Sequence, residues 1–351
     1  MNAQRTRAIV LGGTGYGGAE MIRRLLQHPQ VELVGVGSID HLGEPVSRVH
    51  PNLEGRTQLQ FQRYEPDQVA EAADVALLGL PHDVSLEVLP ALLERGCRVV
   101  DMSAAFRLDD AETYRARYDR AHPRPELLPR CVYGLPELHR SRIAEATAVA
   151  SPGCFATCVE LALWPLAQAG LLKGEVRVVA MTGSSGAGAS TLPTTHHPVR
   201  SVTLRPYAAL RHVQSFEMAE QLEAAGATDL SFDFVPVSAP LGRGILAVAQ
   251  LSVPEAWTEV RLRELLASTY ASERFVRVPG HRDPEVGAVA GSNYAEVGVR
   301  VGAPRDGRRS AAVFGALDNL IKGGAGQAIQ SMNLMLGFDE ATSLEDPGHY
   351  P

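Results

Sequence analysis

The amino-acid sequence predicts an α/β protein in which a doubly wound parallel sheet is followed by an α+β domain with an antiparallel or mixed sheet. Two observations predict the first part. Strand-like and helix-like segments alternate in the first half of the chain, and a glycine-rich loop joins the first such pair. A third observation predicts the second part, because the later strand candidates are longer and alternate between apolar and polar residues.

The elements of the first domain follow one another in strand–helix order. Arg7–Leu11 is a short apolar run, and residues 12–18 separate it from the helical pattern of Ala19–His28. The later elements are strands at Val31–Gly37, Asp74–Leu80 and Arg98–Met102, a helix ending at Val69–Ala73 and a helix at Ser85–Arg95. Strands that alternate with helices pair in parallel and carry helices on both faces of the sheet.

After Ala150 the pattern changes. Cys154–Ala169 predicts one helix, and Val176–Met181 predicts a strand that leads into the polar stretch Thr182–Leu192. Further strands are predicted at Phe232–Val237, Gly244–Val253 and Ala295–Val301, and a helix at Gln327–Leu336. Because we expect the last segment to rejoin the first domain, the predicted domains are 1–150 plus 314–351, which binds nucleotide, and 151–313, which carries catalysis and dimerisation.

Composition limits the class of protein. A chain of 351 residues with 45% hydrophobic and 21% charged residues is long enough for about two globular domains. The formal net charge of −7 argues against a nucleic-acid partner, and no apolar run approaches the roughly 18 residues of a membrane helix. Four cysteines do not make a disulfide framework, and the first residues do not resemble a signal peptide. We therefore expect a soluble, cytoplasmic protein.

The loop after the first strand predicts a cofactor site. Gly12, Gly15 and Gly18 recur at three-residue spacing between a strand and a helix. Glycines there allow a tight turn and let backbone N–H groups approach a pyrophosphate at the helix N-terminus, as in Rossmann-type domains. At the end of the second strand, Ser38 suits the 2′-phosphate of NADP and Asp40 repels it. NADP(H) and NAD(H) therefore both remain open at this point.

Cys154 is the candidate nucleophile. It follows Pro152 and Gly153 and begins a predicted helix, where the positive end of the helix dipole favours a thiolate. The free N–H groups of that helix could also hold an oxyanion. For Cys97, Cys131 and Cys158 we expect buried, unreactive side chains, and the cysteines do not suggest a metal site.

Other polar residues could serve the same site. His212 could act as a general acid or base, with Glu217 five residues further on, although a structural role is the commoner fate of such a histidine. Ser184–Gly188 offers hydroxyl and backbone N–H groups to an anion, or is a flexible loop. The adjacent His196 and His197 point in different directions, so we expect no metal there.

Six motifs, taken in order, resemble those of N-acetyl-γ-glutamyl-phosphate reductases. They are GGTGYGG, SAAFRL (Ser103–Leu108), YGLPEL (Tyr133–Leu138), SPGC (Ser151–Cys154), SSGAG (Ser184–Gly188) and LDNLIKGGAGQAIQSMNLMLG (Leu317–Gly337). The resemblance covers nearly the whole chain and implies a fold like glyceraldehyde-3-phosphate and aspartate-semialdehyde dehydrogenases. HPNLEGR (His50–Arg56), THHP (Thr195–Pro198) and GSNYAEVG (Gly291–Gly298) look more like a sub-branch that reduces aminoadipyl or glutamyl phosphate on an amino-group carrier protein.

The resemblance also implies roles for individual residues. It implies Cys154 as the nucleophile, with His212 and Glu217 for proton transfer. The cofactor contacts that it implies are Gly12, Thr14, Gly15, Tyr16, Ser38 and Asn319, and Gly13 and Gly18 complete the predicted glycine loop. The candidates for binding anionic groups of the substrate are Arg107, Ser184, Ser185 and Gly186. Three departures stand out: Gln214 replaces a histidine of the family's H-x-H-x-x-E segment, Ala105 replaces an aspartate, and Ile39 replaces an arginine that would favour NADP.

These residues predict an NADP-dependent acyl-phosphate reductase that forms a thioester on Cys154 and releases a semialdehyde. The predicted substrate is N-acetyl-γ-glutamyl phosphate of arginine biosynthesis, and the alternative is the carrier-bound aminoadipyl or glutamyl phosphate of lysine or ornithine biosynthesis. An acidic carrier would suit the arginines at positions 200, 205 and 211. Because Gln214 replaces a histidine and Ala105 replaces an aspartate, a non-catalytic NAD(P)-binding regulator stays open. A hydrolase that uses Cys154 and His212 is a third alternative, which the glycine loop disfavours. We expect a homo-oligomer, a dimer or a tetramer.

Overall fold

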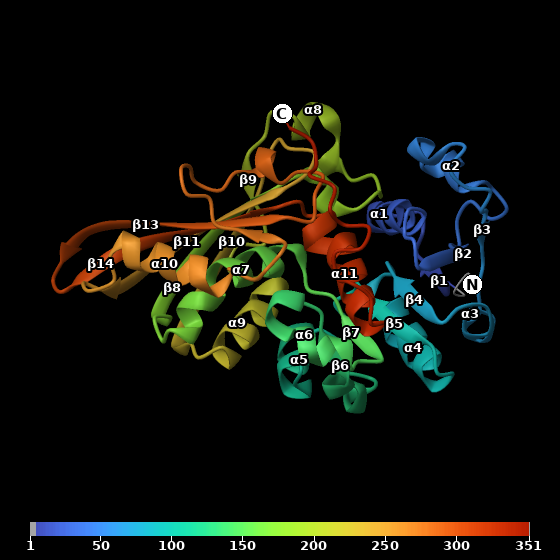
Figure 1. The fold of residues 1–351 in the computed structure, drawn as a ribbon, viewed down its shortest axis with the longest axis horizontal. Coiled ribbons are helices and arrows are strands. Elements are labelled where there is room, and N and C mark those ends of the chain that lie inside the picture. Colours follow the sequence, from blue (N-terminus) through green and yellow to red (C-terminus); the bar gives the residue numbers. More distant parts are fainter. Residues whose placement is uncertain (1–4, 351) are drawn as a thin grey trace. The chain divides into compact units, whose positions relative to one another are not determined.

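The computed structural model describes residues 5–350, which form two compact units (Figure 1). The first unit comprises residues 5–152 and 324–345, and the second comprises residues 153–323 and 346–350. The chain therefore passes between the units three times. The sequence places the return to the first domain at Phe314, whereas in the structure the chain stays in the second unit up to Gly323.

The first unit is built on a parallel sheet of seven strands in the order β3-β2-β1-β4-β5-β7-β6. The strands are β1 (Thr6–Leu11), β2 (Val31–Gly37), β3 (Phe61–Gln62), β4 (Val75–Leu78), β5 (Arg98–Asp101), β6 (Cys131–Tyr133) and β7 (Ala148–Ala150). The strand order reverses between β1 and β4. In such a sheet, ligands bind at the carboxyl ends of the strands at this reversal, which is where the glycine loop leaves β1.

Helices accompany this sheet: α1 (Tyr16–Leu25), α2 (Val46–Val49), α3 (Pro66–Ala72), α4 (His82–Glu94), α5 (Ala111–Tyr118), α6 (Pro136–Ala144) and α11 (Gly326–Met335). Apolar side chains of α3 and α4, such as Val69 and Leu89, pack with Ile9 and Ala76 of the strands in one buried core. The strands and helices that the sequence predicts for this unit are all present, within a few residues of the predicted bounds. Strands β6 and β7 were not predicted, since each has only three residues.

The second unit contains a mixed sheet of seven strands in the order β12-β13-β14-β11-β8-β10-β9. The strands are β8 (Lys173–Thr182), β9 (Arg205–Pro206), β10 (Thr228–Ser238), β11 (Ile245–Pro254), β12 (Val276–Arg277), β13 (Ala295–Arg305) and β14 (Arg308–Leu317). Strand β10 pairs with β8 in parallel, and β12 with β13, whereas the other pairs are antiparallel. Of the antiparallel and mixed alternatives, the structure therefore has the mixed sheet.

Helices α7 (Cys154–Gln168), α9 (Gln214–Ala224) and α10 (Glu259–Thr269) lie along one side of this sheet (Figure 1), and α8 (His197–Arg200) is a single short turn. Helix α7 contacts β11 and β14, and 12 of its 15 residues are buried. Its first residue is Cys154, as the sequence predicts, and the core beneath it fixes that end of the helix.

Strand β14 was not predicted. It extends β13 through a hairpin whose turn residues, Asp306 and Gly307, both have positive φ, 53° and 73°. Asp-Gly is a strong signal for such a turn because both central residues must tolerate this conformation. Residues 308–317 therefore belong to the second sheet, and Phe314 pairs with Val248 of β11.

Candidate functional site

The glycine loop after β1 is pressed against neighbouring backbone. Gly12 has φ of +81°, and a Cβ there would lie 2.3 Å from the carbonyl oxygen of Gly79. A Cβ on Gly18 would lie 2.5 Å from the carbonyl oxygen of Gly12. Both positions therefore exclude any larger residue through contacts inside the protein itself.

Gly15 is different. A Cβ at this position would make only an ordinary contact, 3.7 Å from the carbonyl oxygen of Gly12. Gly15 is the N-cap of α1, and no side chain caps this helix and no acidic residue lies in its first turn. The first N–H groups of α1 therefore have no side-chain acceptor at an end of the helix that attracts negative charge. This donor set and the small residues around it fit a pyrophosphate.

The end of β2 faces the same loop. Ser38 Oγ lies 3.5 Å from Thr14 Oγ1 and accepts a hydrogen bond from the Asp40 N–H at 3.0 Å. The Ile39 side chain is 79% exposed, so it contributes little to the core. On the other side, His50 Nε2 contacts the carbonyl oxygen of Gly13 at 2.7 Å. Ser38 therefore contacts the loop at Thr14, and His50 contacts it at Gly13.

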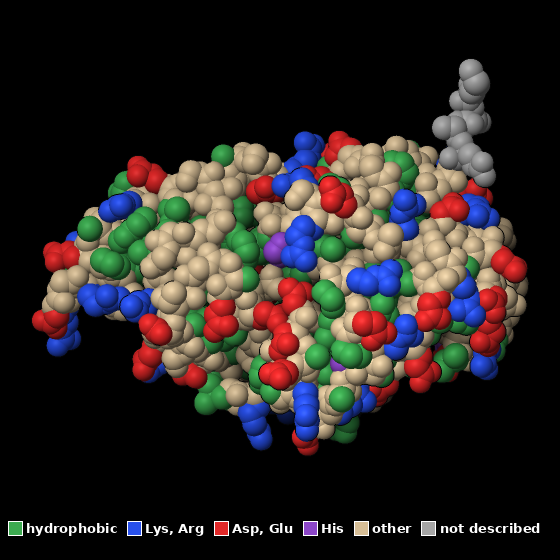
Figure 2. Space-filling view, turned by 90° about the horizontal axis from the view of Figure 1, so that it is seen from below, with side chains coloured by type: hydrophobic (Ala, Val, Ile, Leu, Met, Phe, Trp, Pro, Cys, Tyr) green, Lys and Arg blue, Asp and Glu red, His purple; other side chains and the backbone are tan. Residues whose placement is uncertain are grey.

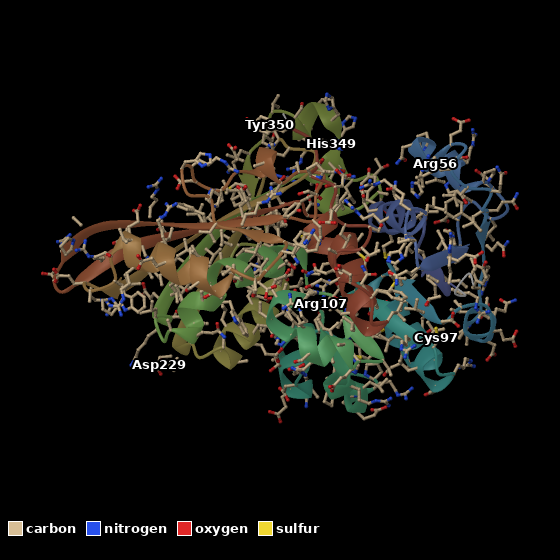
Figure 3. The ribbon with its side chains drawn as sticks, viewed as in Figure 1. Arg56, Cys97, Arg107, Asp229, His349 and Tyr350 are labelled. Carbon is tan, nitrogen blue, oxygen red and sulfur yellow. The ribbon has the colours of Figure 1, made fainter. Side chains whose placement is uncertain are left out.

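Arg107, labelled in Figure 3, is tied to backbone carbonyls of the first unit. Its Nε donates to the Ser151 carbonyl at 2.8 Å, and its Nη2 donates to the Met102 carbonyl at 2.7 Å. These carbonyls follow the neighbouring strands β7 and β5. Arg107 therefore orders the segment from which the chain continues to Gly153, in addition to any role toward a substrate.

In the second unit, two side chains of α9 hold the N-terminus of α7. Gln214 Oε1 accepts from the N–H groups of Phe155 at 2.9 Å and Ala156 at 3.1 Å, and Glu217 Oε2 accepts from the Gly153 N–H at 3.2 Å. Cys154 lies between these anchored residues and is half-exposed. The prediction that the N–H groups at this turn could hold an oxyanion is wrong for those of Gly153, Phe155 and Ala156. These three already donate hydrogen bonds to the side chains of Glu217 and Gln214.

Gln214 is the functional residue whose role sequence reasoning missed. Its position was noted only as a departure from a family motif, whereas the structure uses its amide as a cap for α7. The side chain is so close that a Cβ on Gly153 would lie 2.2 Å from Gln214 Cδ. Gly153 is therefore required by its contact with Gln214.

His212 precedes α9 and lies among aromatic rings. Its ring centroid is 5.4 Å from that of Phe155, 5.5 Å from Phe234 and 5.8 Å from Tyr207. Its Nδ1 accepts from the Gln214 N–H at 3.3 Å. When the ring is neutral, its proton is therefore on Nε2.

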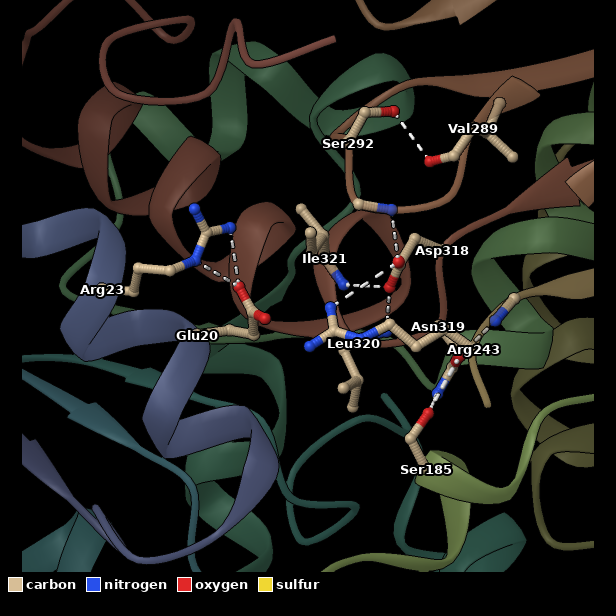
Figure 4. A network of polar contacts seen from close by, with 12 residues as sticks. Glu20, Arg23, Ser185, Arg243, Val289, Ser292, Asp318, Asn319, Leu320 and Ile321 are labelled. Atoms are coloured by element: carbon tan, nitrogen blue, oxygen red, sulfur yellow. Dashed lines mark hydrogen bonds and ion pairs between the residues drawn. The ribbon is translucent and has the colours of Figure 1, made fainter. Parts of the chain in front are cut away.

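The loop at residues 184–188 is held by Asn319 (Figure 4). Asn319 Nδ2 donates to Ser185 Oγ at 3.0 Å, and Asn319 Oδ1 accepts from the Gly244 N–H at 2.7 Å. The neighbouring Asp318 accepts from the N–H groups of Leu320 and Ile321. Asn319 thus fixes the half-buried Ser184 and Ser185 to the start of β11.

Gly323 is a second residue that the sequence did not indicate. A Cβ at this position would lie 2.7 Å from Cys154 Cβ, so Gly323 packs directly against the cysteine. No signal short of the structure indicates this contact, because 169 residues separate the two positions (323 minus 154).

The other three cysteines are buried, as predicted. Burial raises the pKa of Cys97 to about 11 and that of Cys131 to about 12, and it raises the pKa of Cys158 further still. Within residues 5–350, no three His, Cys, Asp or Glu side chains form a group that could hold a metal ion. No helix in this part of the chain is long and apolar enough to cross a membrane.

On the face drawn in Figure 2, acidic and basic side chains are interspersed. That face therefore does not present the continuous basic surface that nucleic-acid binding requires.

A nucleotide-binding parallel sheet and a mixed sheet with a cysteine at a helix N-terminus define a class: two-domain dehydrogenases. Residues 7–146 match the family model of the semialdehyde dehydrogenase NAD binding domain, and residues 154–319 match that of the semialdehyde dehydrogenase dimerisation domain. The chain belongs to the semialdehyde dehydrogenase family and is an oxidoreductase with a nicotinamide-cofactor-binding domain.

Two relatives match over nearly the full length. The N-acetyl-gamma-glutamyl-phosphate reductase of Desulforudis audaxviator is 41% identical over 97% of this chain and 99% of its own. The LysW-L-2-aminoadipate/LysW-L-glutamate phosphate reductase of Saccharolobus solfataricus is 39% identical over 97% of each chain. Among solved structures, aspartate semialdehyde dehydrogenase II of Vibrio cholerae has a TM-score of 0.71 at 17% identity, covering 95% of this chain and 99% of that one. The predicted fold is confirmed.

Proposed function

We propose that this enzyme reduces the acyl phosphate of an N-blocked acidic amino acid to its semialdehyde through a thioester on Cys154, with NADP(H) as cofactor. The observation that carries this proposal is the half-exposed Cys154 at the start of α7, held by Gln214 and Glu217. The names of the full-length relatives support the substrate class.

Cys154 is the proposed nucleophile. Its thiolate attacks the carbonyl carbon of the acyl phosphate, a carbon–sulfur bond forms, and the carbon–oxygen bond to phosphate breaks as inorganic phosphate leaves. When bound, the reduced nicotinamide supplies the hydride for the second half of the reaction. Gln214 and Glu217 hold the turn around Cys154, so that the sulfur is placed by backbone contacts on both sides of it.

His212 is the proposed acid/base. The amide side chain of Gln214 is neither an acid nor a base near neutral pH, so Gln214 cannot take over proton transfer from the histidine of the family motif. The Gln214 N–H occupies Nδ1 of His212, which leaves the proton on Nε2. We propose that Nε2 donates this proton to the carbonyl oxygen of the thioester as its carbon is reduced, and takes it back when the thiohemiacetal collapses, the carbon–sulfur bond breaks and the semialdehyde leaves.

Glu217 is proposed as a positioning residue. Glu217 accepts from the backbone of the turn that precedes Cys154, so it holds that turn in place. Asn319 has a similar task toward the 184–188 loop, in which Ser184, Ser185 and Gly186 are proposed to bind an anionic group of the substrate. Arg107 remains a proposed substrate contact.

The pyrophosphate contacts are proposed at Gly12, Gly13, Thr14, Gly15, Tyr16 and Gly18. The preference for NADP rests on Ser38, whose hydroxyl lies beside Thr14 at the end of β2, where the 2′-phosphate is placed in such domains. Ile39 supplies no positive charge and Asp40 repels a phosphate, so we expect a modest preference over NAD.

A second candidate differs only in the group that blocks the amino nitrogen. The motifs HPNLEGR, THHP and GSNYAEVG resemble the carrier-linked sub-branch, and relatives such as that of Sulfurisphaera tokodaii carry the carrier LysW in their names. For this candidate the partner is an acidic carrier protein that bears the aminoadipyl or glutamyl phosphate, and a basic surface near Arg205 and Arg211 is its proposed docking site.

A homo-oligomer is proposed through the sheet face that carries no helix. Val248 of β11 pairs with Val179 and Phe314, so the three apolar side chains share one face. Val179 is 42% exposed, while the alternate residues Val178 and Val313 are buried. The match to a dimerisation domain supports a second copy of the chain as the partner of this face.

The decisive assay runs the reaction in reverse. The purified enzyme is mixed with semialdehyde, inorganic phosphate and NADP or NAD, and cofactor reduction is followed with free N-acetylglutamate semialdehyde and with carrier-bound aminoadipate semialdehyde. We expect reduction that depends on phosphate and is faster with NADP. Cofactor reduction without phosphate, or no reduction with either semialdehyde, would contradict the proposal.

A further inference from the structure

Arg200, the last residue of α8, is a buried cation with unused donors. The residue is 8% exposed, and its Nη2 donates to the carbonyl oxygen of Thr182 at 2.9 Å. Its Nε and Nη1 are fully buried and have no hydrogen-bond partner within the described part of the chain. Buried guanidinium groups are normally paired, because a buried cation without a partner is strongly unfavourable.

No carboxylate of the described residues forms an ion pair with Arg200. Burial lowers the pKa of Arg200, and the nearby positive charge of Arg205 lowers it further, while Tyr207 acts in the opposite direction. A partly buried arginine elsewhere in the second unit shows the usual arrangement. Arg282 donates to both oxygens of the buried Glu296, at 2.5 and 2.6 Å.

The place of Arg200 relates it to the candidate site. Thr182, which accepts from Arg200, is the last residue of β8, and the chain continues directly into Gly183 and the 184–188 loop. Tyr207, whose ring contacts His212, is close enough to feel the charges of both Arg200 and Cys154. The charges that act on Arg200 are those of Arg205 and Tyr207.

We propose that Arg200 binds a carboxylate of the substrate that is separate from the reacting acyl phosphate. This inference rests on the proposed function, in which the substrate is an amino-blocked acidic amino acid and therefore carries a free α-carboxylate at one end and the acyl phosphate at the other. The planar guanidinium retains donors at Nε and Nη1, which suits an oxygen anion. Tyr207 lies close to both Arg200 and Cys154, so a carboxylate bound at Arg200 and an acyl carbon at Cys154 can belong to one substrate.

The test compares a carboxylate with its ester in the reverse assay. We use whichever semialdehyde the wild-type enzyme turns over, and the same compound with its α-carboxylate converted to a methyl ester. The enzymes are wild type, Arg200→Met, Arg200→Lys, and the control Arg305→Met, which removes an exposed positive charge at the β13–β14 hairpin of the same unit. KM is measured for the semialdehyde and for inorganic phosphate.

We expect Arg200→Met to raise the KM for the free acid about 100-fold, because it removes one partner of a buried charged pair, and to leave the KM for the ester and for phosphate unchanged. Arg200→Lys should recover part of the loss, and Arg305→Met should behave like wild type. An increase in the KM for phosphate would assign the guanidinium to the leaving group and overturn the proposal. Equal effects on acid and ester would overturn it too.

Two further measurements keep the proposal testable. If Arg200→Met does not fold, the wild-type enzyme alone decides, because equal KM values for acid and ester would overturn the proposal. If the wild-type enzyme reduces no cofactor at all, the proposed function fails. Calorimetric titration of N-acetylglutamate then tests Arg200 separately: binding to wild type that is weaker in Arg200→Lys supports the carboxylate site, and equal or absent binding overturns it.

Discussion

The glycine loop of the first unit and the cysteine turn of the second unit are both helix N-termini that follow a glycine, yet they are built in opposite ways. Gly12, Gly15 and Gly18 lie within seven consecutive residues. Gly15 and Gly18 approach only backbone of the loop itself, and Gly12 approaches the backbone of Gly79. The turn at Cys154 is held by side chains 58 to 64 residues away in the sequence.

A short sequence pattern is enough to encode the glycine loop. The cysteine turn, in contrast, exists only after distant segments of the chain have folded together. The N-terminus of α1 has no side-chain cap, so its N–H groups are available to a ligand. The N-terminus of α7 has its N–H groups at Phe155 and Ala156 occupied by Gln214. The first helix end is therefore suited to binding an anion, and the second to holding a reactive side chain in place.

The largest expected effect is that of Cys154→Ser. Oxygen is a much weaker nucleophile than a thiolate near neutral pH, so we expect kcat to fall by about a thousand-fold or more. The helix end should keep its caps, so the melting temperature should change little. Steady-state kinetics in the reverse direction measures the loss. A serine variant that kept more than about a tenth of the wild-type rate would show that the reaction does not pass through a thioester on this residue.

The next effect concerns His212, which precedes α9, and Gln214, the first residue of α9. We expect His212→Asn to lower kcat about 100-fold and to remove the dependence of the rate on pH near neutrality, since general acid–base catalysis contributes about 100-fold or more. Adding Gln214→His to this variant should restore part of the rate. Gln214→His in the wild-type background is the matched control. If His212→Asn keeps the wild-type pH profile, His212 serves only as a packing residue among Phe155, Tyr207 and Phe234.

A smaller effect tests the glycine loop. Gly15→Ala should raise the KM for the cofactor about 10-fold and leave stability unchanged, because the new methyl group has room inside the protein but meets a bound pyrophosphate. Gly18→Ala should instead cost about 3 kcal/mol of unfolding free energy, since its Cβ would clash with backbone. Denaturant unfolding and cofactor titration distinguish the two. The pyrophosphate assignment would be lost if Gly15→Ala left the KM for the cofactor unchanged.

The same contrast explains what the sequence could predict. Strands β1, β2, β4 and β5 and helices α1, α3 and α4 of the first unit follow from apolar runs and periodicity, and the glycine loop from its place between β1 and α1. The start of α7 at Cys154 was also predictable, because Pro152 and Gly153 precede an apolar helical pattern. In each case the signal lies in neighbouring residues.

What the sequence did not show depends on contacts between distant residues. The amide of Gln214, the packing of Gly323 on Cys154 and the unpaired donors of Arg200 all depend on which segments meet in the folded chain. Strand β14 is a different case, because Asp306-Gly307 between two alternating segments was a readable hairpin signal. Using it would have kept Phe314 in the second unit.

The smallest expected effect concerns pH and the first unit. His28 and His122 each accept a backbone N–H at Nδ1, from Gln30 at 3.2 Å and Arg124 at 3.1 Å, and each contacts an oxygen through Nε2. Burial lowers the pKa of both rings below the usual 6.5. The unfolded chain therefore binds more protons than the folded one as pH falls through 6.5, and the free energy of unfolding decreases in that range.

We expect hydrogen exchange, corrected for its intrinsic pH dependence, to show more opening in first-unit peptides at about pH 5.5 than at about pH 7.5. In the double variant His28→Gln/His122→Gln, whose amides can still donate and accept but do not titrate, this pH dependence should weaken. An unchanged slope would mean that other groups of the first unit set its response to acid.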